Sequence, residues 1–159
     1  MNRYLTTALL AGGALLFGVR GDAQQPAAPG RTALQAIVAP DQFSIPVPIS
    51  PAIRAGRLVF VAGMPGFDSS GRIAAGDFAA QMRQAMTNIT QVLAAAGAGW
   101  DRVAKVDVLL TRAGDFAEMN RIYAGFFPDR RYPARTTAIV AALPQPTSLI
   151  EIDCEAVLD

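Results

Sequence analysis

Histidine is absent from the sequence, and several other chemically versatile features are scarce. Without histidine, catalysis by Ser-His-Asp or Cys-His groups is excluded, and so are most zinc sites. The one cysteine, Cys154, excludes an internal disulfide framework. A formal net charge of +1 provides no basic surface for nucleic acid, so we expect no nucleic-acid partner.

The remaining composition is typical of a globular protein. The chain has 159 residues, of which 52% are hydrophobic and 17% are charged. This length and balance predict one domain with a sizeable core. We place that domain at residues 32–159.

The first 23 residues have the pattern of a secretory signal peptide. Arg3 lies beside the amino terminus, an apolar run follows from Leu5 to Val19, and a Gly-Asp-Ala exit ends at Ala23. An uncleaved membrane anchor is the alternative, but the run is shorter than the ~20 residues of a spanning helix. We therefore expect cleavage, a flexible leader at residues 24–31, and a periplasmic or secreted protein without a membrane anchor.

Strand patterns occur on both sides of a helical region. Residues 32–38 predict a first strand, and residues 52–55 and 57–62 predict a hairpin about Gly56. The second hairpin strand is apolar from Leu58 to Val61, so we expect cover on both of its faces, and Gly63 is expected to end it. Residues 103–111 predict another strand, and two β-patterned runs lie between Pro133 and Glu155.

Two amphipathic helices are predicted between these strands. Asp77 begins the first helix and Gly97 ends it. Its polar residues are expected to face away from the sheet; they are Gln81, Arg83, Gln84, Asn88 and Gln91. Asp115 and Glu118 have the spacing of a capping box for the second helix, which Pro128 is expected to stop.

This order of elements predicts an α+β fold with both helices on one face of a mixed β-sheet. The other face of the sheet is then uncovered. Because apolar residues are abundant and only two helices are available, we expect self-association through that face.

Two charged residues stand in otherwise core-like strands. Arg135 lies among small and β-branched residues, and Glu151 lies between Ile150 and Ile152. Such charges are costly unless they are paired or used, although both could also be solvated strand residues. In a simple hairpin the two side chains would be ~17 Å apart at ~3.3 Å per residue. Either the strands are not neighbours, or the side chains meet across a subunit boundary.

Three blocks of sequence resemble the RidA (YjgF) family of enamine and imine deaminases. The C-terminal block contains Pro-Ala-Arg-Thr-Thr from Pro133, then Ala-Ala-Leu-Pro and Ile-Glu-Ile. The other two blocks are Ser50 to Gly63 and Asp115 to Phe127, in the family's order. The resemblance covers residues 50–157, most of the mature chain.

The resemblance implies a chorismate mutase-like (YjgF-like) fold assembled as a homotrimer, with ligand clefts between subunits. It implies that a further strand lies between the last two strands. The ~17 Å separation calculated for a simple hairpin would then no longer keep Arg135 and Glu151 from sharing a ligand. Arg135 would hold a substrate carboxylate, a task suited to the two parallel donors of a guanidinium. Glu151 would hold a water against the C=N carbon with help from the main chain at Thr137, and Asn120 would belong to the same site. No metal or organic cofactor is implied.

Several positions depart from the family pattern. Ile49 replaces a common tyrosine, Ala62 replaces Ser or Thr before Gly63, and Met64 replaces a usual glutamine. Thr137 stands where many relatives have cysteine. We assign these positions to the substrate site, from which hydroxyl groups have been lost. Each hydrogen bond lost to a charged ligand costs ~1.5 to 3 kcal/mol.

Three interpretations of function follow. The first is a deaminase that hydrolyses reactive 2-enamino or 2-imino acids to 2-oxo acids and ammonia, weakened or altered in substrate. The second is a non-catalytic trimer that binds small carboxylate metabolites. The third is a ribonuclease or translation inhibitor, a label often attached to this family. The expected export and the near-neutral charge argue against this RNA-binding function.

Overall fold

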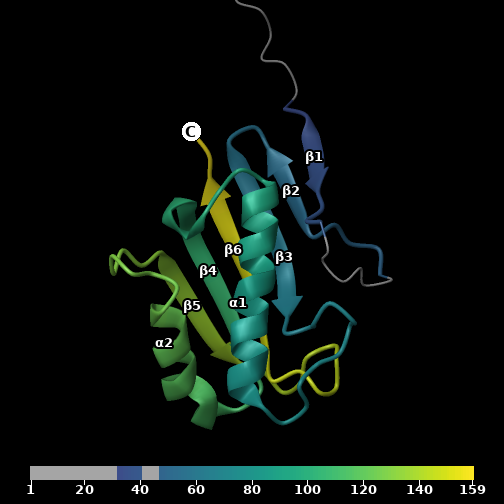
Figure 1. The fold of residues 1–159 in the computed structure, drawn as a ribbon, viewed down its shortest axis with the longest axis vertical. Coiled ribbons are helices and arrows are strands. Elements are labelled where there is room, and N and C mark those ends of the chain that lie inside the picture. Colours follow the sequence, from purple (N-terminus) through teal and green to yellow (C-terminus); the bar gives the residue numbers. More distant parts are fainter. Residues whose placement is uncertain (1–31, 41–46) are drawn as a thin grey trace, which may run out of the picture. The chain divides into compact units, whose positions relative to one another are not determined.

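The computed structural model describes residues 32–40 and 47–159, and these form a helix-covered β-sheet (Figure 1). The predicted signal peptide at residues 1–23 and leader at residues 24–31 lie outside the described residues. In the part of the chain that is described, no helix is long and apolar enough to cross a membrane.

Six strands form one sheet in the order β1-β2-β3-β6-β4-β5. All neighbours are antiparallel except β4 and β5, which are parallel, so the sheet is mixed as predicted. Both helices cover the same face (Figure 1). The bounds are β1 Leu34–Ile37, β2 Ala52–Ala55, β3 Leu58–Pro65, α1 Phe78–Ala95, β4 Val103–Leu110, α2 Phe116–Ala124, β5 Ala134–Ile139 and β6 Ile150–Val157.

Helix α1 begins and ends where the sequence indicates. The Asp77 carboxylate accepts a hydrogen bond from the Ala80 amide at 3.0 Å, which satisfies one of the free amides of the first turn. Gly97 follows the helix with a φ of 80°, a left-handed conformation that glycine adopts without strain. The apolar side of α1 packs against β3 and β6 and forms the centre of the core.

The predicted polar side of α1 is wrong at two residues. Gln81 is 0% exposed and Asn88 is 7% exposed, whereas both were expected to face solvent. Each side-chain amide is hydrogen-bonded to backbone groups outside the helix, which makes its burial tolerable.

The capping box predicted for α2 is also wrong. The Asp115 side chain makes no capping bond; it pairs with Arg112, whose Nε lies 2.7 Å from Oδ2. Glu118 pairs instead with Arg121, one turn further along the helix. Helix α2 ends at Ala124, four residues before the proline that was expected to stop it.

Strand β3 differs from its prediction in length and in cover. It continues through Gly63 to Pro65, with one extra residue against β6 between Val61 and Met64, which is a β-bulge. Leu58 and Phe60 are 45% and 43% exposed, so the protomer covers only one face of this strand. The sheet face opposite the helices is therefore open in the single chain.

Candidate functional site

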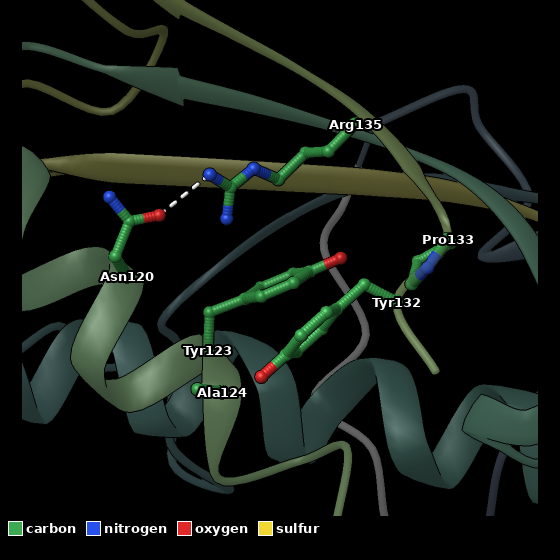
Figure 2. Close-up of a pocket in the computed structure, with 6 residues that line it drawn as sticks. All are labelled: Asn120, Tyr123, Ala124, Tyr132, Pro133 and Arg135. Atoms are coloured by element: carbon green, nitrogen blue, oxygen red, sulfur yellow. Dashed lines mark hydrogen bonds between the residues drawn. The ribbon is translucent and has the colours of Figure 1, made fainter. Parts of the chain in front are cut away.

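Arg135 lies on β5 and extends beneath the helices, where α2 holds it (Figure 2). Its Nη2 donates a hydrogen bond to Asn120 Oδ1 at 2.6 Å, and its Nη1 lies 3.6 Å from the sulfur of Met119. The guanidinium carbon is 4.7 Å from the centre of the Tyr123 ring, a cation–π contact. Arg135 and Asn120, which the resemblance assigned to the same site, are therefore in direct contact.

Arg135 and Asn120 face a cavity of about 420 Å³. Two tyrosine rings, which the sequence did not identify, form much of its wall. Tyr123 lies one helical turn after Asn120, and Tyr132 immediately precedes Pro133, so spacing from the predicted residues was the available signal. The cavity is lined by Asn120, Tyr123, Ala124, Tyr132, Pro133 and Arg135 (Figure 2).

The charge of Arg135 is not neutralised within residues 32–40 and 47–159. Arg112 and Arg121 each form an ion pair with a carboxylate of their own segment, whereas Arg135 forms none with any residue described. Its Nε–H likewise has no acceptor in this part of the chain. A half-buried guanidinium with free donors can bind a carboxylate through two parallel hydrogen bonds.

Thr137 follows Arg135 by two residues on the same side of β5, and its hydroxyl is buried without a partner among the described residues. Strand β5 is at the edge of the sheet. Val140 donates its amide to Leu110 on β4 at 2.8 Å, and amide directions alternate along a strand. The main-chain N–H and C=O of Thr137, three residues earlier, consequently point away from β4 toward the open edge.

A second cluster surrounds Glu151 on β6. The side chain lies directly over Gly63, where an added Cβ would come within 3.0 Å of Glu151 Cδ and closer still to Oε1. Burial raises the pKa of the Glu151 carboxyl, and the nearby carboxylate of Asp153 raises it further. A carboxyl group with a raised pKa can exchange protons nearer neutral pH than an ordinary one.

The three other predicted site residues, Ile49, Ala62 and Met64, lie in different surroundings. Ile49 is 56% exposed, before β2. Ala62 adjoins Gly63 and donates its amide to the Pro51 carbonyl at 2.9 Å. The Met64 side chain is buried in the core, because the bulge after Val61 turns Gly63 toward Glu151 and Met64 toward the helices.

The two clusters lie on opposite faces of the sheet. Arg135 is paired with Val106 of β4, which is buried beneath the helices, whereas Glu151 is paired with Leu109, three residues further along. Because side chains alternate between faces, an odd separation on β4 puts the two partners on opposite sides. Three residues also add about 10 Å along the strand.

Strand β4 does lie between β5 and β6, as the resemblance implied. We expected that this inserted strand would allow Arg135 and Glu151 to reach one ligand in the same protomer, and that expectation is wrong. Within one protomer, a single small ligand cannot contact both Arg135 and Glu151. The first of the two alternatives set by the sequence is confirmed, because β5 and β6 are not neighbours in the sheet. A site that used both side chains would in addition need two copies of the chain.

Comparisons with known proteins agree on one family. A family model described as Endoribonuclease L-PSP matches residues 25–158. The Homo sapiens protein named 2-iminobutanoate/2-iminopropanoate deaminase is 39% identical over 111 residues, or 69% of this chain and 80% of that protein. The Rid-family protein YyfA from Yersinia pestis superposes with a TM-score of 0.76 at 31% identity, covering 79% of this chain and all of that one. TdcF from E. coli, solved with bound serine, has a TM-score of 0.73 at 29% identity over 79% of this chain and 99% of its own.

Proposed function

The chain belongs to the RidA/YjgF family, and from that premise we propose that it hydrolyses 2-enamino or 2-imino acids to 2-oxo acids and ammonia. The observation that carries the proposal is Arg135. It is a half-buried cation with free donors, no carboxylate partner in the described residues, and a cavity in front of it. The name of the human relative and the serine bound to TdcF are consistent with a substrate that carries a carboxylate.

In the proposed reaction, Arg135 binds the substrate carboxylate while Asn120 fixes the plane of the guanidinium. Glu151 orients a water molecule against the C=N carbon and accepts a proton as the water oxygen bonds to that carbon. The C=N π bond breaks as the same carboxyl group returns that proton to the nitrogen, which gives a carbinolamine. The carboxylate then takes the remaining hydroxyl proton and passes it to the amine nitrogen; the C–N bond breaks, ammonia leaves, and the C=O bond forms. Hydrolysis neither oxidises nor reduces the substrate, so its balance requires only water.

The proposed site is built between two copies of the chain in a homotrimer. One copy supplies Arg135 and the open edge at Thr137, and its neighbour supplies Glu151 and Gly63. The uncovered sheet face, where Leu58 and Phe60 are exposed, supports such an assembly. Light scattering on residues 24–159 is expected to give the mass of a trimer at micromolar concentration, and a monomer would contradict this proposal.

The second candidate function is a trimeric binder of small carboxylate metabolites without turnover. It is favoured by the lost hydroxyl groups at Ile49 and Ala62, since Arg135 needs neither residue to bind a carboxylate. Losing one hydrogen bond to a charged group costs ~1.5 to 3 kcal/mol, or about 10- to 100-fold in rate.

One assay separates the two candidates. An amino-acid oxidase generates the imino acid, and the purified protein is tested for faster loss of the imine. We expect measurable acceleration by the wild type, none by Glu151→Gln, and wild-type rates for Glu155→Gln, a control on the same strand and face. Turnover that Glu151→Gln leaves unchanged would refute the mechanism.

Restoring the missing hydroxyls extends the same assay. Ala62→Ser combined with Ile49→Tyr is expected to raise imine hydrolysis by ~10-fold or more, the value of one charge-assisted hydrogen bond. In a binding protein, the same double substitution would change ligand preference without producing turnover.

We also propose that residues 1–23 are removed on export, leaving a periplasmic or secreted protein that begins at Gln24. Terminal sequencing of the protein isolated from its native host tests this directly. A chain that retains Met1 would contradict it.

A further inference from the structure

Helix α1 carries two buried amide side chains, Gln81 and Asn88, seven residues and two turns apart. Apolar residues at these positions would need no hydrogen-bond partners, whereas each buried amide is destabilising unless its polar atoms are hydrogen-bonded. All the bonds that satisfy Gln81 go to segments outside the helix. The two amides therefore fix other parts of the backbone relative to α1.

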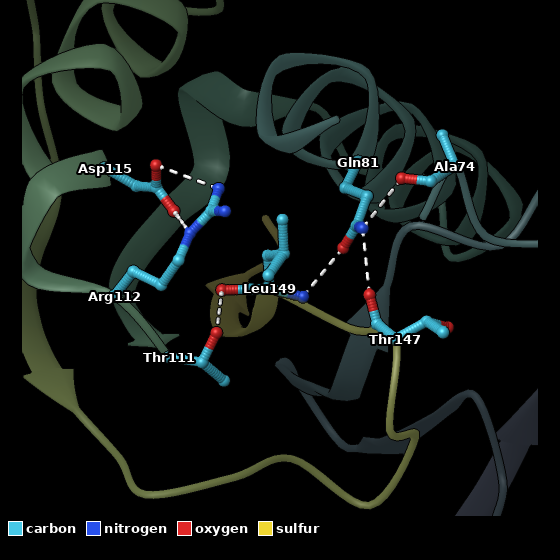
Figure 3. A network of polar contacts seen from close by, with 7 residues as sticks. All are labelled: Ala74, Gln81, Thr111, Arg112, Asp115, Thr147 and Leu149. Atoms are coloured by element: carbon cyan, nitrogen blue, oxygen red, sulfur yellow. Dashed lines mark hydrogen bonds and ion pairs between the residues drawn. The ribbon is translucent and has the colours of Figure 1, made fainter. Parts of the chain in front are cut away.

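Gln81 holds the segment that enters β6 (Figure 3). Its Oε1 accepts the Leu149 amide proton at 2.7 Å, and its Nε2 donates to the carbonyls of Thr147 at 3.0 Å and Ala74 at 2.9 Å. From the other side, the Thr111 amide donates to the Leu149 carbonyl at 3.1 Å. Leu149 is thus bound on both sides, two residues before Glu151.

Asn88 holds the end of β3, which is the other neighbour of Glu151. Its Nδ2 donates to the carbonyls of Pro65 at 3.2 Å and Phe67 at 3.0 Å. Pro65 is the residue paired with Glu151 across the two strands. Gly66, between the two carbonyls, lies so close to α1 that an added Cβ would be 2.7 Å from Gln81 Cα.

We propose that Gln81 is a positioning residue for the reaction, with Asn88 as its counterpart, because the two side chains fix the strand ends that hold the Glu151 carboxyl over Gly63. Neither side chain touches the substrate in this arrangement. The inference rests on the proposed catalytic role of Glu151. Buried side chains of α1 would thus determine how accurately the Glu151 carboxyl is placed on the opposite face of the sheet.

Gln81→Met tests the proposal, because methionine keeps the length of the side chain and removes all three hydrogen bonds. We expect kcat to fall by on the order of 10- to 100-fold, the effect of a displacement near 1 Å, with KM changed less than about twofold. Gln91→Met, an exposed position on the same helix, is the matched control and is expected to match the wild type. A role limited to stability would lower the melting temperature and leave kcat per folded molecule unchanged.

A second measurement tests whether Gln81 positions Glu151 and does not depend on enzymatic activity. Carbon-13 NMR on the trimeric protein follows the Glu151 carboxyl titration, identified by its loss in Glu151→Gln. We expect Gln81→Met to move this titration toward the ordinary carboxyl range, and an unchanged titration would overturn the proposal.

Two further outcomes remain informative. If Gln81→Met fails to fold, Asn88→Leu takes its place in both measurements and is expected to shift kcat and the Glu151 titration in the same direction. If the wild type shows no turnover, the deaminase proposal fails, while the NMR comparison still accepts or refutes positioning by Gln81.

Discussion

Replacement of Arg135 by methionine is the most direct test of the site. Methionine keeps an apolar side chain beside Tyr123 but removes every donor and the charge. With one Nη2–H bound to Asn120 at 2.6 Å and Nη1 beside the Met119 sulfur, three of the five N–H groups of Arg135 stay available, and a ligand carboxylate can accept two parallel bonds from them. At ~1.5 to 3 kcal/mol for each charge-assisted bond, the loss is ~3 to 6 kcal/mol, or about 10² to 10⁴ in affinity.

The same substitution is expected to leave the fold intact. Because Arg135 pairs with no carboxylate in the described residues, its removal leaves no buried carboxylate unpaired. The folded state loses one hydrogen bond to Asn120 and one cation–π contact with Tyr123, together about 1 to 3 kcal/mol. Thermal unfolding should therefore still be cooperative, with a modestly lower midpoint.

Calorimetry with 2-oxobutanoate, a small 2-oxo acid of the proposed product class, measures the affinity. Arg121→Met is the matched control, since Arg121 lies on α2 and is paired with Glu118 at the surface. Affinity lost in Arg135→Met and kept in Arg121→Met supports the assignment. An Arg135→Met protein that binds normally, or that fails to fold, would show that the guanidinium is structural.

Three further predictions concern the Glu151 cluster. Gly63→Ala is expected to displace the carboxyl and abolish turnover without changing carboxylate affinity in calorimetry, whereas Gly114→Ala, where an added Cβ meets nothing within 4 Å, should be silent. Burial raises the pKa of Glu151 above its ordinary 4.5, so the stability that this carboxyl contributes is complete below pH 4.5 and is lost as the pH rises through the folded-state pKa. The melting temperature of Glu151→Gln should therefore exceed that of the wild type at neutral pH but not at pH 4. Finally, inactive Arg135→Met and Glu151→Gln chains, unfolded and refolded together in equal amounts, should regain about a quarter of wild-type activity, while no recovery would place both residues in one subunit.

The order of elements could be predicted because its signals are local. Asp77 and Gly97 bound α1 through short-range backbone chemistry, and Gly56 has the φ of 63° that a tight turn between β2 and β3 requires. Alternation of apolar residues likewise located β4 without knowledge of its neighbours.

Where the prediction was wrong, long-range partners decided the outcome. The helical period places Gln81 and Asn88 among polar neighbours, and only the backbone of the 147–149 and 65–67 segments makes their burial favourable. At the start of α2, the competing ion pair of Asp115 with Arg112 removed the expected cap. Neither set of partners has a fixed spacing in the sequence.

The candidate site shows the same difference between local signals, which the sequence carries, and long-range arrangement, which it does not. Arg135 and Glu151 could be found as charges in apolar strands, and the family blocks led to Asn120. Their placement on opposite faces could not be found, because it depends on the registers of β5 and β6 against β4. The tyrosine wall at Tyr132 belongs to a loop and leaves no periodic signal.

The opposite placement of the two clusters also restricts how copies can assemble. If one site needs Arg135 from one copy and Glu151 from another, the helix-side edge of β5 must meet the open sheet face of the next copy. A head-to-tail contact joins two different surfaces of the chain in this way. Head-to-tail contacts form a closed ring when the rotation between successive copies closes, and the proposed trimer is a small ring of this kind.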